Sequence, residues 1–467
     1  MLKKLSYALL CFIIFFSFTL TVSANEFILK DQQQVILLGN SITQLGEKPE
    51  GYVSLMRKIV KTLYPEKTIY LLNSGISGHK STDMNARLQR DVLQFKPDWV
   101  TISVGINDVW HGYLRQKPKL GHLRGVPLDD FTKNLTEIVE RAQSDGIKVA
   151  LFTTTVIMEK LDSDENKTLA QYNARIKKIA RKHNCLLVDL NKVFQNELKP
   201  YQSNDMSPSG QLTYDGVHMN ESGNWLMAKT ILSAFGVPVS RIVQSKPLVH
   251  DLVKKEMERN TNNMNRYAEC NFEVGAPRDN EKRVVFYGSS SVDGWNLARD
   301  FPTIPILNRG IGGETTREMI HRFREDVVNL KPTALLLFYG SCNDFWEHNR
   351  MSPNETKLNT IRIVNIARAN NIKIALGAIS PVNDYIQEKD WISSHPIAEV
   401  KDINNWMKTY CLSEDIPYID FFTSVADSNN KLISEYTHDG MHCNKKGYAQ
   451  WKPLVIDALK KLNAWQD

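Results

Sequence analysis

The chain of 467 residues is longer than a single hydrophobic core usually supports, so we expect two domains. Its composition, with 42% hydrophobic and 24% charged residues, is typical of a globular protein and excludes a disordered chain. Lys and Arg outnumber Asp and Glu by only 58 to 52 and form no basic block, which argues against a nucleic-acid partner.

The first 24 residues differ from the rest of the chain. Lys3 and Lys4 precede the apolar stretch ALLCFIIFFSFTLTV, which ends in the small residues VSA. This pattern predicts a signal peptide over residues 1–24, export to the periplasm or the outside, and no stable membrane insertion after cleavage. An uncleaved membrane anchor is the alternative, although the stretch is shorter than the ~20 residues of a spanning helix.

Residues 25–245 alternate short apolar runs with helical segments, which is typical of parallel strands joined by crossover helices. The five expected strands are 35–39, 68–73, 99–105, 148–154 and 186–190. The first three are followed by the polar motifs GNSIT, NSGISG and GINDVW, and YDGVHMNESG stands near the end of this half. We therefore predict one α/β domain here.

Residues 246–280 are polar, Asn-rich and punctuated by Pro and Gly, and we interpret them as a linker with some helix. Residues 281–467 then repeat the first pattern. The expected strands are 283–288, 304–308, 334–340, 372–379 and 416–420. The motifs GSSSV, NRGIGG, GSCNDFW and HDGMHCNKKG follow in the same order, which indicates a duplicated domain with a second five-stranded parallel sheet.

These motifs combine residue types that ester hydrolysis requires. Ligands bind at the carboxyl edge of a parallel sheet, where the first three motifs bring a serine, glycine N–H groups and an Asn amide. Such donors can stabilise the oxyanion of acyl transfer, and the Asp-Gly-x-His motif adds a base and the aspartate that orients it. The two predicted triads are Ser41, Asp215, His218 and Ser290, Asp439, His442.

The four motif blocks resemble those of the SGNH or GDSL-type hydrolase superfamily, once in each half. The resemblance implies two tandem flavodoxin-like three-layer domains and a nucleophile two residues after the first glycine, which selects Ser290 among the three serines of GSSSV. The oxyanion residues that it implies are Gly78, Asn107, Gly313 and Asn343. Where the superfamily often has Asp before the nucleophile, this chain has Asn40 and Ser289, so we expect altered site geometry.

The sequence thus predicts a serine ester hydrolase, and the superfamily and the export signal favour an acetylated carbohydrate or other small ester as substrate. The alternatives are a lipase- or thioesterase-type acyl hydrolase, or one active domain joined to a non-catalytic carbohydrate-binding domain. No spacing typical of a zinc site occurs, so we predict no metal or other cofactor. A dinucleotide site is rejected because NRGIGGET lacks the Gly-x-Gly-x-x-Gly spacing.

Three features near these motifs have two interpretations each. Trp110 and Trp346 follow the oxyanion Asn residues by three positions and are either pocket walls or packed aromatics. Cys342 and Cys443 adjoin site residues and are either a disulfide or two apolar fillers. Residues 111–130 are rich in Lys and Arg and are either a solvated loop or a loop that makes the first site prefer the more anionic glycan.

Overall fold

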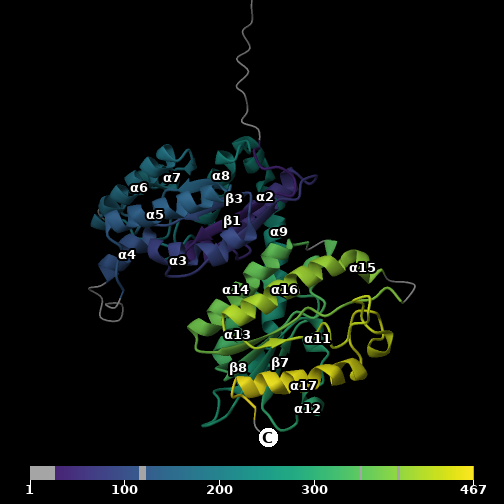
Figure 1. The fold of residues 1–467 in the computed structure, drawn as a ribbon. Helices are drawn as coiled ribbons and strands as arrows, with labels where there is room; N and C mark the ends of the chain where they lie inside the picture. Colours follow the sequence, from purple (N-terminus) through teal and green to yellow (C-terminus); the bar gives the residue numbers. More distant parts are fainter. Residues whose placement is uncertain (1–26, 115–122, 204, 348–349, 386–389, 466–467) are drawn as a thin grey trace, which may run out of the picture.

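The computed structural model describes residues 27–114, 123–203, 205–347, 350–385 and 390–465. Over these ranges the chain forms two α/β domains, each built on a parallel sheet of five strands, with the long helix α9 (Val239–Asn265) running between them (Figure 1). Among the described residues, no helix is both long and apolar enough to span a bilayer. The predicted signal peptide lies outside these ranges.

The first sheet has the strand order β2-β1-β3-β4-β5, which is the flavodoxin-like order. Its strands are β1 (Gln34–Gly39), β2 (Tyr70–Gly75), β3 (Trp99–Ser103), β4 (Lys148–Phe152) and β5 (Leu186–Val188). Helices cover both faces, so the strands are nearly continuous runs of buried apolar residues. The helices are α1 (Ser41–Leu45), α2 (Tyr52–Leu63), α3 (Ser81–Asp91), α4 (Ile106–Leu114), α5 (Leu128–Ser144), α6 (Asp164–Lys182), α7 (Leu190–Leu198) and α8 (Glu221–Ala234).

The second sheet repeats this order as β7-β6-β8-β9-β10. Its strands are β6 (Val284–Gly288), β7 (Ile306–Gly310), β8 (Ala334–Phe338), β9 (Lys373–Gly377) and β10 (Tyr418–Ile419). Its helices are α11 (Ser290–Asp293), α12 (Leu297–Asp300), α13 (Thr316–Asp326), α14 (Pro353–Ala369), α15 (Trp391–Ser394), α16 (Ile397–Ser413) and α17 (Lys445–Lys461). Every predicted strand overlaps an observed one, and the predicted fold class is confirmed.

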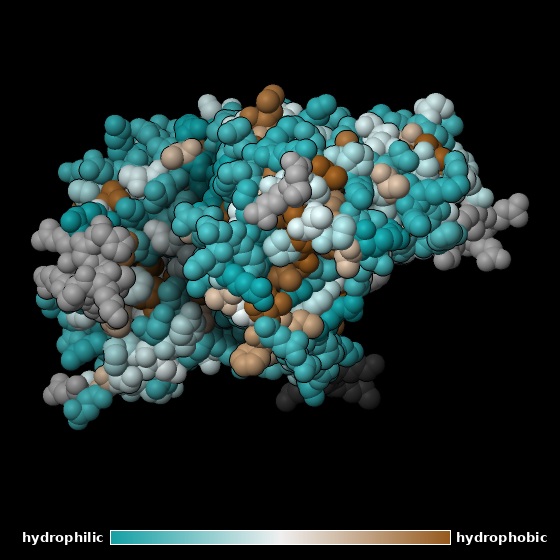
Figure 2. Space-filling view, turned by 90° about the horizontal axis from the view of Figure 1, so that it is seen from below, coloured by the Kyte–Doolittle hydropathy of each residue, from teal (hydrophilic) through white to brown (hydrophobic). Residues whose placement is uncertain are grey.

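Helices fill most of the segment predicted as a linker. The helix α9 begins within the predicted first domain, and α10 (Ala268–Val274) follows it. Because α9 packs on α2 of the first domain and on α13 of the second, it connects the two domains through side-chain contacts as well as through the chain. Viewed from the side of α12 and α17, the surface is mainly hydrophilic with narrow apolar areas (Figure 2).

The two domains also meet at the outer edge of the first sheet, where α14 lies along the edge strand β2. Glu47 of the first domain is buried there and pairs with Arg317 at 3.3 Å, Arg362 at 3.4 Å and its own domain's Arg57. Glu355 of α14 pairs with Arg57 at 3.5 Å and with Arg317. Burial by itself would raise the pKa of Glu47, but these arginines lower it well below the usual range.

Candidate active site

The first predicted nucleophile lies at the turn from the central strand β1 into α1. A side chain at Gly39, where β1 ends, would lie 2.0 Å from Thr43 Oγ1, so only glycine allows this close approach. Asn40 then caps α1, because its side-chain oxygen accepts a hydrogen bond from Ile42 N at 3.0 Å. These two residues hold Ser41 at the carboxyl edge of the sheet.

The structure brings the first predicted triad together. His218 Nε2 lies 2.8 Å from Ser41 Oγ, and its Nδ1 lies 2.6 Å from Asp215 Oδ2. The other oxygen of Asp215 accepts backbone hydrogen bonds from Val217 at 3.0 Å and His218 at 2.8 Å. Partial burial raises the pKa of Asp215, but these hydrogen bonds outweigh it and lower the pKa below its ordinary value. The aspartate is therefore an anion suited to orienting the imidazole.

The second triad repeats this geometry. His442 Nε2 lies 2.9 Å from Ser290 Oγ, and its Nδ1 lies 2.7 Å from Asp439 Oδ2. Partial burial opposes ionisation of Asp439, but hydrogen bonds from His442 and Met441 lower its pKa to about 2. The neighbouring Ser289 is buried and donates to the backbone carbonyl of Tyr339, directly before the third motif, at 2.6 Å, so it does not serve the histidine.

The predicted oxyanion residues take equivalent positions in the two domains. Gly78 and Gly313 have φ angles of +80° and +79°, and a side chain at either position would meet no atom within 4 Å. Glycine is thus favoured by the left-handed backbone and not by lack of space. Asn107 Nδ2 donates to the His79 carbonyl at 3.0 Å, and Asn343 Nδ2 donates to the Glu314 carbonyl at 2.9 Å. Each bond orients the amide and leaves its second hydrogen for a ligand.

Two residues that hold the oxyanion loops were missed by the sequence analysis. Gln44 Oε1 accepts from Ser77 N at 2.6 Å, and Asp293 Oδ2 accepts from Gly312 N at 3.2 Å. Both acceptors stand three residues after the serine, and both donors immediately precede the oxyanion glycine. The equal distance from the serine could have pointed to both residues, but their side chains differ, so comparison of the two motifs did not. Asp293 is also paired at 2.7 Å with Arg266, the residue that follows α9.

A buried aspartate follows each oxyanion Asn and ties two motifs together. Asp108 Oδ1 accepts from Ser81 N at 3.0 Å and from its hydroxyl at 2.5 Å, and Asp344 accepts from Thr316 N at 2.8 Å. Burial raises the pKa of Asp108 to about 6, although the hydrogen bonds from Ser81 oppose the shift. Burial likewise raises the pKa of Asp344. These residues fix the loop of the second motif against the third.

The two sites differ in the charge behind the oxyanion loop. Arg87 and Arg322 each donate to the carbonyl of the first-motif glycine, at 2.8 and 3.3 Å. In the second domain Arg322 is paired with buried Glu314 at 2.6 Å. In the first domain the equivalent position, directly after the oxyanion glycine, is His79. Burial, with the nearby Arg87 charge, lowers the pKa of His79 to about 4, so it is neutral at pH 7.

The two predicted substrate-binding tryptophans have different surroundings. Trp110 is edge-on to the His218 ring at 6.4 Å between centroids, while Tyr214 stacks on that ring at 5.7 Å and is 56% exposed. Trp346 donates from its indole N–H to Asn343 Oδ1 at 3.2 Å and lies 5.5 Å from Trp391. Trp110 therefore borders the histidine of the first predicted triad, and Trp346 orients the side chain of Asn343, a predicted oxyanion residue.

Two other predictions can be compared with the described residues. Within the described ranges, no group of three or more His, Cys, Asp and Glu side chains could hold a metal ion. Cys342 and Cys443 are buried and unbonded, which agrees with their interpretation as small apolar fillers. Of the basic segment 111–130, residues 115–122, which include Arg115, lie outside the described residues.

A hydrogen-bonded serine, histidine and aspartate at the edge of each of two flavodoxin-like sheets is typical of an esterase-type hydrolase. The chain belongs to the GDSL-like lipase/acylhydrolase family, whose sequence profile matches residues 37–226 and 278–450.

Known relatives resemble one domain at a time. An acetylxylan esterase of Geobacillus stearothermophilus is 32% identical over 215 residues, which are 44% of this chain and 94% of that enzyme. Among solved structures, the acetyl xylan esterase AlAXEase is 36% identical to this chain, with a TM-score of 0.40. The match covers 43% of this chain and 98% of the AlAXEase chain. Axe2, an acetylxylan esterase from Geobacillus stearothermophilus, is 30% identical, with 45% and 98% covered and a TM-score of 0.40.

Proposed function

We propose that the protein is an exported carbohydrate O-acetyl esterase with one Ser-His-Asp site in each domain. The observation that carries this proposal is the paired geometry, with serine–histidine distances of 2.8 and 2.9 Å and histidine–aspartate distances of 2.6 and 2.7 Å. The acetylxylan esterase relatives support acetylated xylan or a similar glycan as substrate. Export rests on the N-terminal sequence pattern.

Each site has the groups that a two-step hydrolysis requires. As the serine oxygen bonds to the ester carbonyl carbon, its proton passes to histidine Nε2, and the carbonyl oxygen becomes an oxyanion. The N–H of Gly78 or Gly313 and the free hydrogen of Asn107 or Asn343 stabilise that charge. The carbon–oxygen bond to the sugar then breaks, and the histidine proton goes to the leaving alcohol.

The second step releases acetate and restores the enzyme. Water attacks the acetyl-serine carbonyl while the histidine takes its proton, and the serine leaves with that proton. The anionic aspartate stabilises the imidazolium in both steps, which agrees with the lowered pKa values of Asp215 and Asp439. No side chain other than those of the triad needs to gain or lose a proton.

The test uses Ser41→Ala, Ser290→Ala and the double variant. Acetate release from acetylated xylan, and hydrolysis of p-nitrophenyl acetate and of a long-chain p-nitrophenyl ester, are measured for each. We expect each single variant to keep part of the acetate release and the double variant to lose it. If Ser290→Ala equals the parent on every ester, the second domain is a non-catalytic module. If the long-chain ester is the best substrate, the alternative of a lipase-type hydrolase replaces this proposal.

A further inference from the structure

A small hollow adjoins the first catalytic site. Its volume is about 130 Å³, and its lining includes Tyr214, Ile42 and Lys48. Tyr214 is the residue that stacks on the His218 ring, so this hollow begins beside the catalytic base. Glu50 and Glu221 line its other side.

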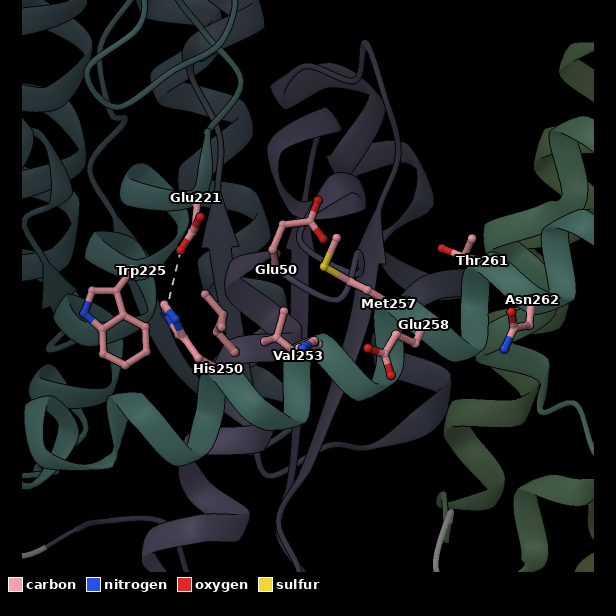
Figure 3. Close-up of a pocket in the computed structure, with 11 residues that line it drawn as sticks. Glu50, Glu221, Trp225, His250, Val253, Met257, Glu258, Thr261 and Asn262 are labelled. Carbon is pink, nitrogen blue, oxygen red and sulfur yellow. Dashed lines mark ion pairs between the residues drawn. The ribbon is translucent and has the colours of Figure 1, made fainter.

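A larger groove continues from the same two glutamates. Glu50 and Glu221 also line a groove of about 700 Å³ along α9 (Figure 3). Figure 3 shows its lining residues spread along the helix from His250 to Asn262, a span of roughly 18 Å at the rise of an α-helix. Since both linings include Glu50 and Glu221, the two hollows lie next to each other, and the smaller one includes Tyr214, which stacks on His218. We call this surface the α9 trough.

The lining of the α9 trough combines apolar and acidic side chains. Trp225, Val253 and Met257 contribute apolar surface, and Met257 is 46% exposed. Glu50 and Glu221 provide carboxylates, and Glu221 is 3.7 Å from the imidazole of His250. Sugar rings present C–H faces that pack on apolar side chains and hydroxyl groups that donate to carboxylates. The volume lies in the range of ligand sites.

The charged residues of the α9 trough favour neutral over anionic glycans. Glu50, Glu221 and Glu258 line the trough, against Lys48 and Lys254. Carboxylates on the ligand would meet these glutamates without a compensating excess of cations, and like charges repel. A neutral chain has no such cost. The described part of this surface therefore favours a neutral glycan, in contrast to the anionic preference expected from residues 111–130.

We infer that the α9 trough binds the neutral polysaccharide chain that carries the acetyl group hydrolysed at Ser41. This inference rests on the proposed function, because it takes the substrate of that site to be an acetylated glycan. Apart from α9, the lining belongs to the first domain, and Tyr214 places it next to His218, so we assign the trough to the first site. Extended substrates gain contacts there that a short ester does not reach.

The experiment measures binding without turnover. Neutral, unacetylated xylo-oligosaccharides of two to six sugars are titrated into the Ser41→Ala/Ser290→Ala protein by calorimetry. We expect affinity to rise with chain length, and Trp225→Ala with Met257→Ala to weaken binding of the hexasaccharide about tenfold, or 1.4 kcal/mol. Met264→Ala is the matched control, because Met264 is a comparably exposed methionine on the same helix outside the trough, 38% against 46% for Met257.

Activity gives a second readout in the Ser290→Ala background. The trough variants should raise KM for acetylated xylo-oligosaccharides about tenfold more than KM for p-nitrophenyl acetate. If the double substitution lowers the thermal midpoint of the protein, the single variant Met257→Lys replaces it in both experiments, because Met257 is exposed. The inference would be overturned if the hexasaccharide does not bind, if affinity does not change with chain length, or if the trough variants bind the hexasaccharide as tightly as their background protein. Binding to the trough without acetate release from xylan by the parent would instead reject the proposed function alone.

Discussion

Removing the acceptor that holds the first oxyanion loop should slow catalysis without weakening substrate binding. Gln44 Oε1 accepts from Ser77 N at 2.6 Å, one residue before Gly78. The perturbation is Gln44→Ala in the Ser290→Ala background, so that only the first site turns over. Ser77 is exposed, so water can replace the lost acceptor, and the cost is that of one ordinary hydrogen bond, about 1 kcal/mol.

This magnitude separates a positioning residue from an oxyanion donor. Loss of a donor itself costs about 10²–10³ in kcat, whereas about 1 kcal/mol corresponds to roughly fivefold. We therefore expect kcat on p-nitrophenyl acetate to fall about fivefold, with KM changed by less than about twofold. The thermal midpoint, read by circular dichroism, should stay close to that of the background protein.

The second site offers a matched comparison in the Ser41→Ala background. Asp293→Ala removes the acceptor for Gly312 N, whereas Asp293→Asn keeps an acceptor and removes the negative charge. We expect the alanine variant to lose kcat about fivefold and the asparagine variant to keep it. If both alanine variants retain the kcat of their backgrounds, or if KM rises instead, these residues do not position the oxyanion loops.

Three further predictions concern stability and the oxyanion turn. Because burial raises the pKa of Asp108 from 3.8 to about 6, its contribution to stability is present below pH 3.8 and lost as pH rises through 6. Asp108→Asn should thus gain up to about 3 kcal/mol over the parent between pH 4 and pH 8 in urea unfolding, and a constant difference would contradict this. Glu47→Gln should destabilise by about 3–5 kcal/mol, because it removes the buried anion of Arg362 and leaves Arg57 and Arg317 to share Glu355, and an unchanged urea midpoint would reject that role. Gly78→Ala should cost about 1–2 kcal/mol through its φ of +80°, with a fall in first-site kcat, and full activity would argue against a left-handed requirement.

The sequence predicts best what is encoded locally. Strand β1 is a run of buried apolar residues that ends in a glycine, and Ser41 follows two residues later. A few adjacent residues are therefore enough to predict the strand, its position and the loop that carries the serine. The duplication strengthens this, because each motif is seen twice. The Asp-Gly-x-His spacing similarly anticipates the contact of Asp215 with His218, since both lie in one short loop.

Contacts between distant segments were not predictable in the same way. Gln44 and Asp293 share a position but not a side chain, so comparison of the two halves gives no common letter. The pairing of Glu47 with Arg362 joins residues of two domains and leaves no periodic pattern. Export and the role of residues 111–130 stay predictions, because the predicted signal peptide and residues 115–122 lie outside the described residues.

The position of α14 along strand β2 also bears on how this protein can be divided. A first domain produced alone would present β2 as an open edge, with unpaired backbone groups that invite self-association. It would also expose Glu47 and Arg57 without their cationic and anionic partners from the second domain. The duplicated halves have thus become dependent on each other, and a truncation that keeps one complete triad does not keep one complete folding unit.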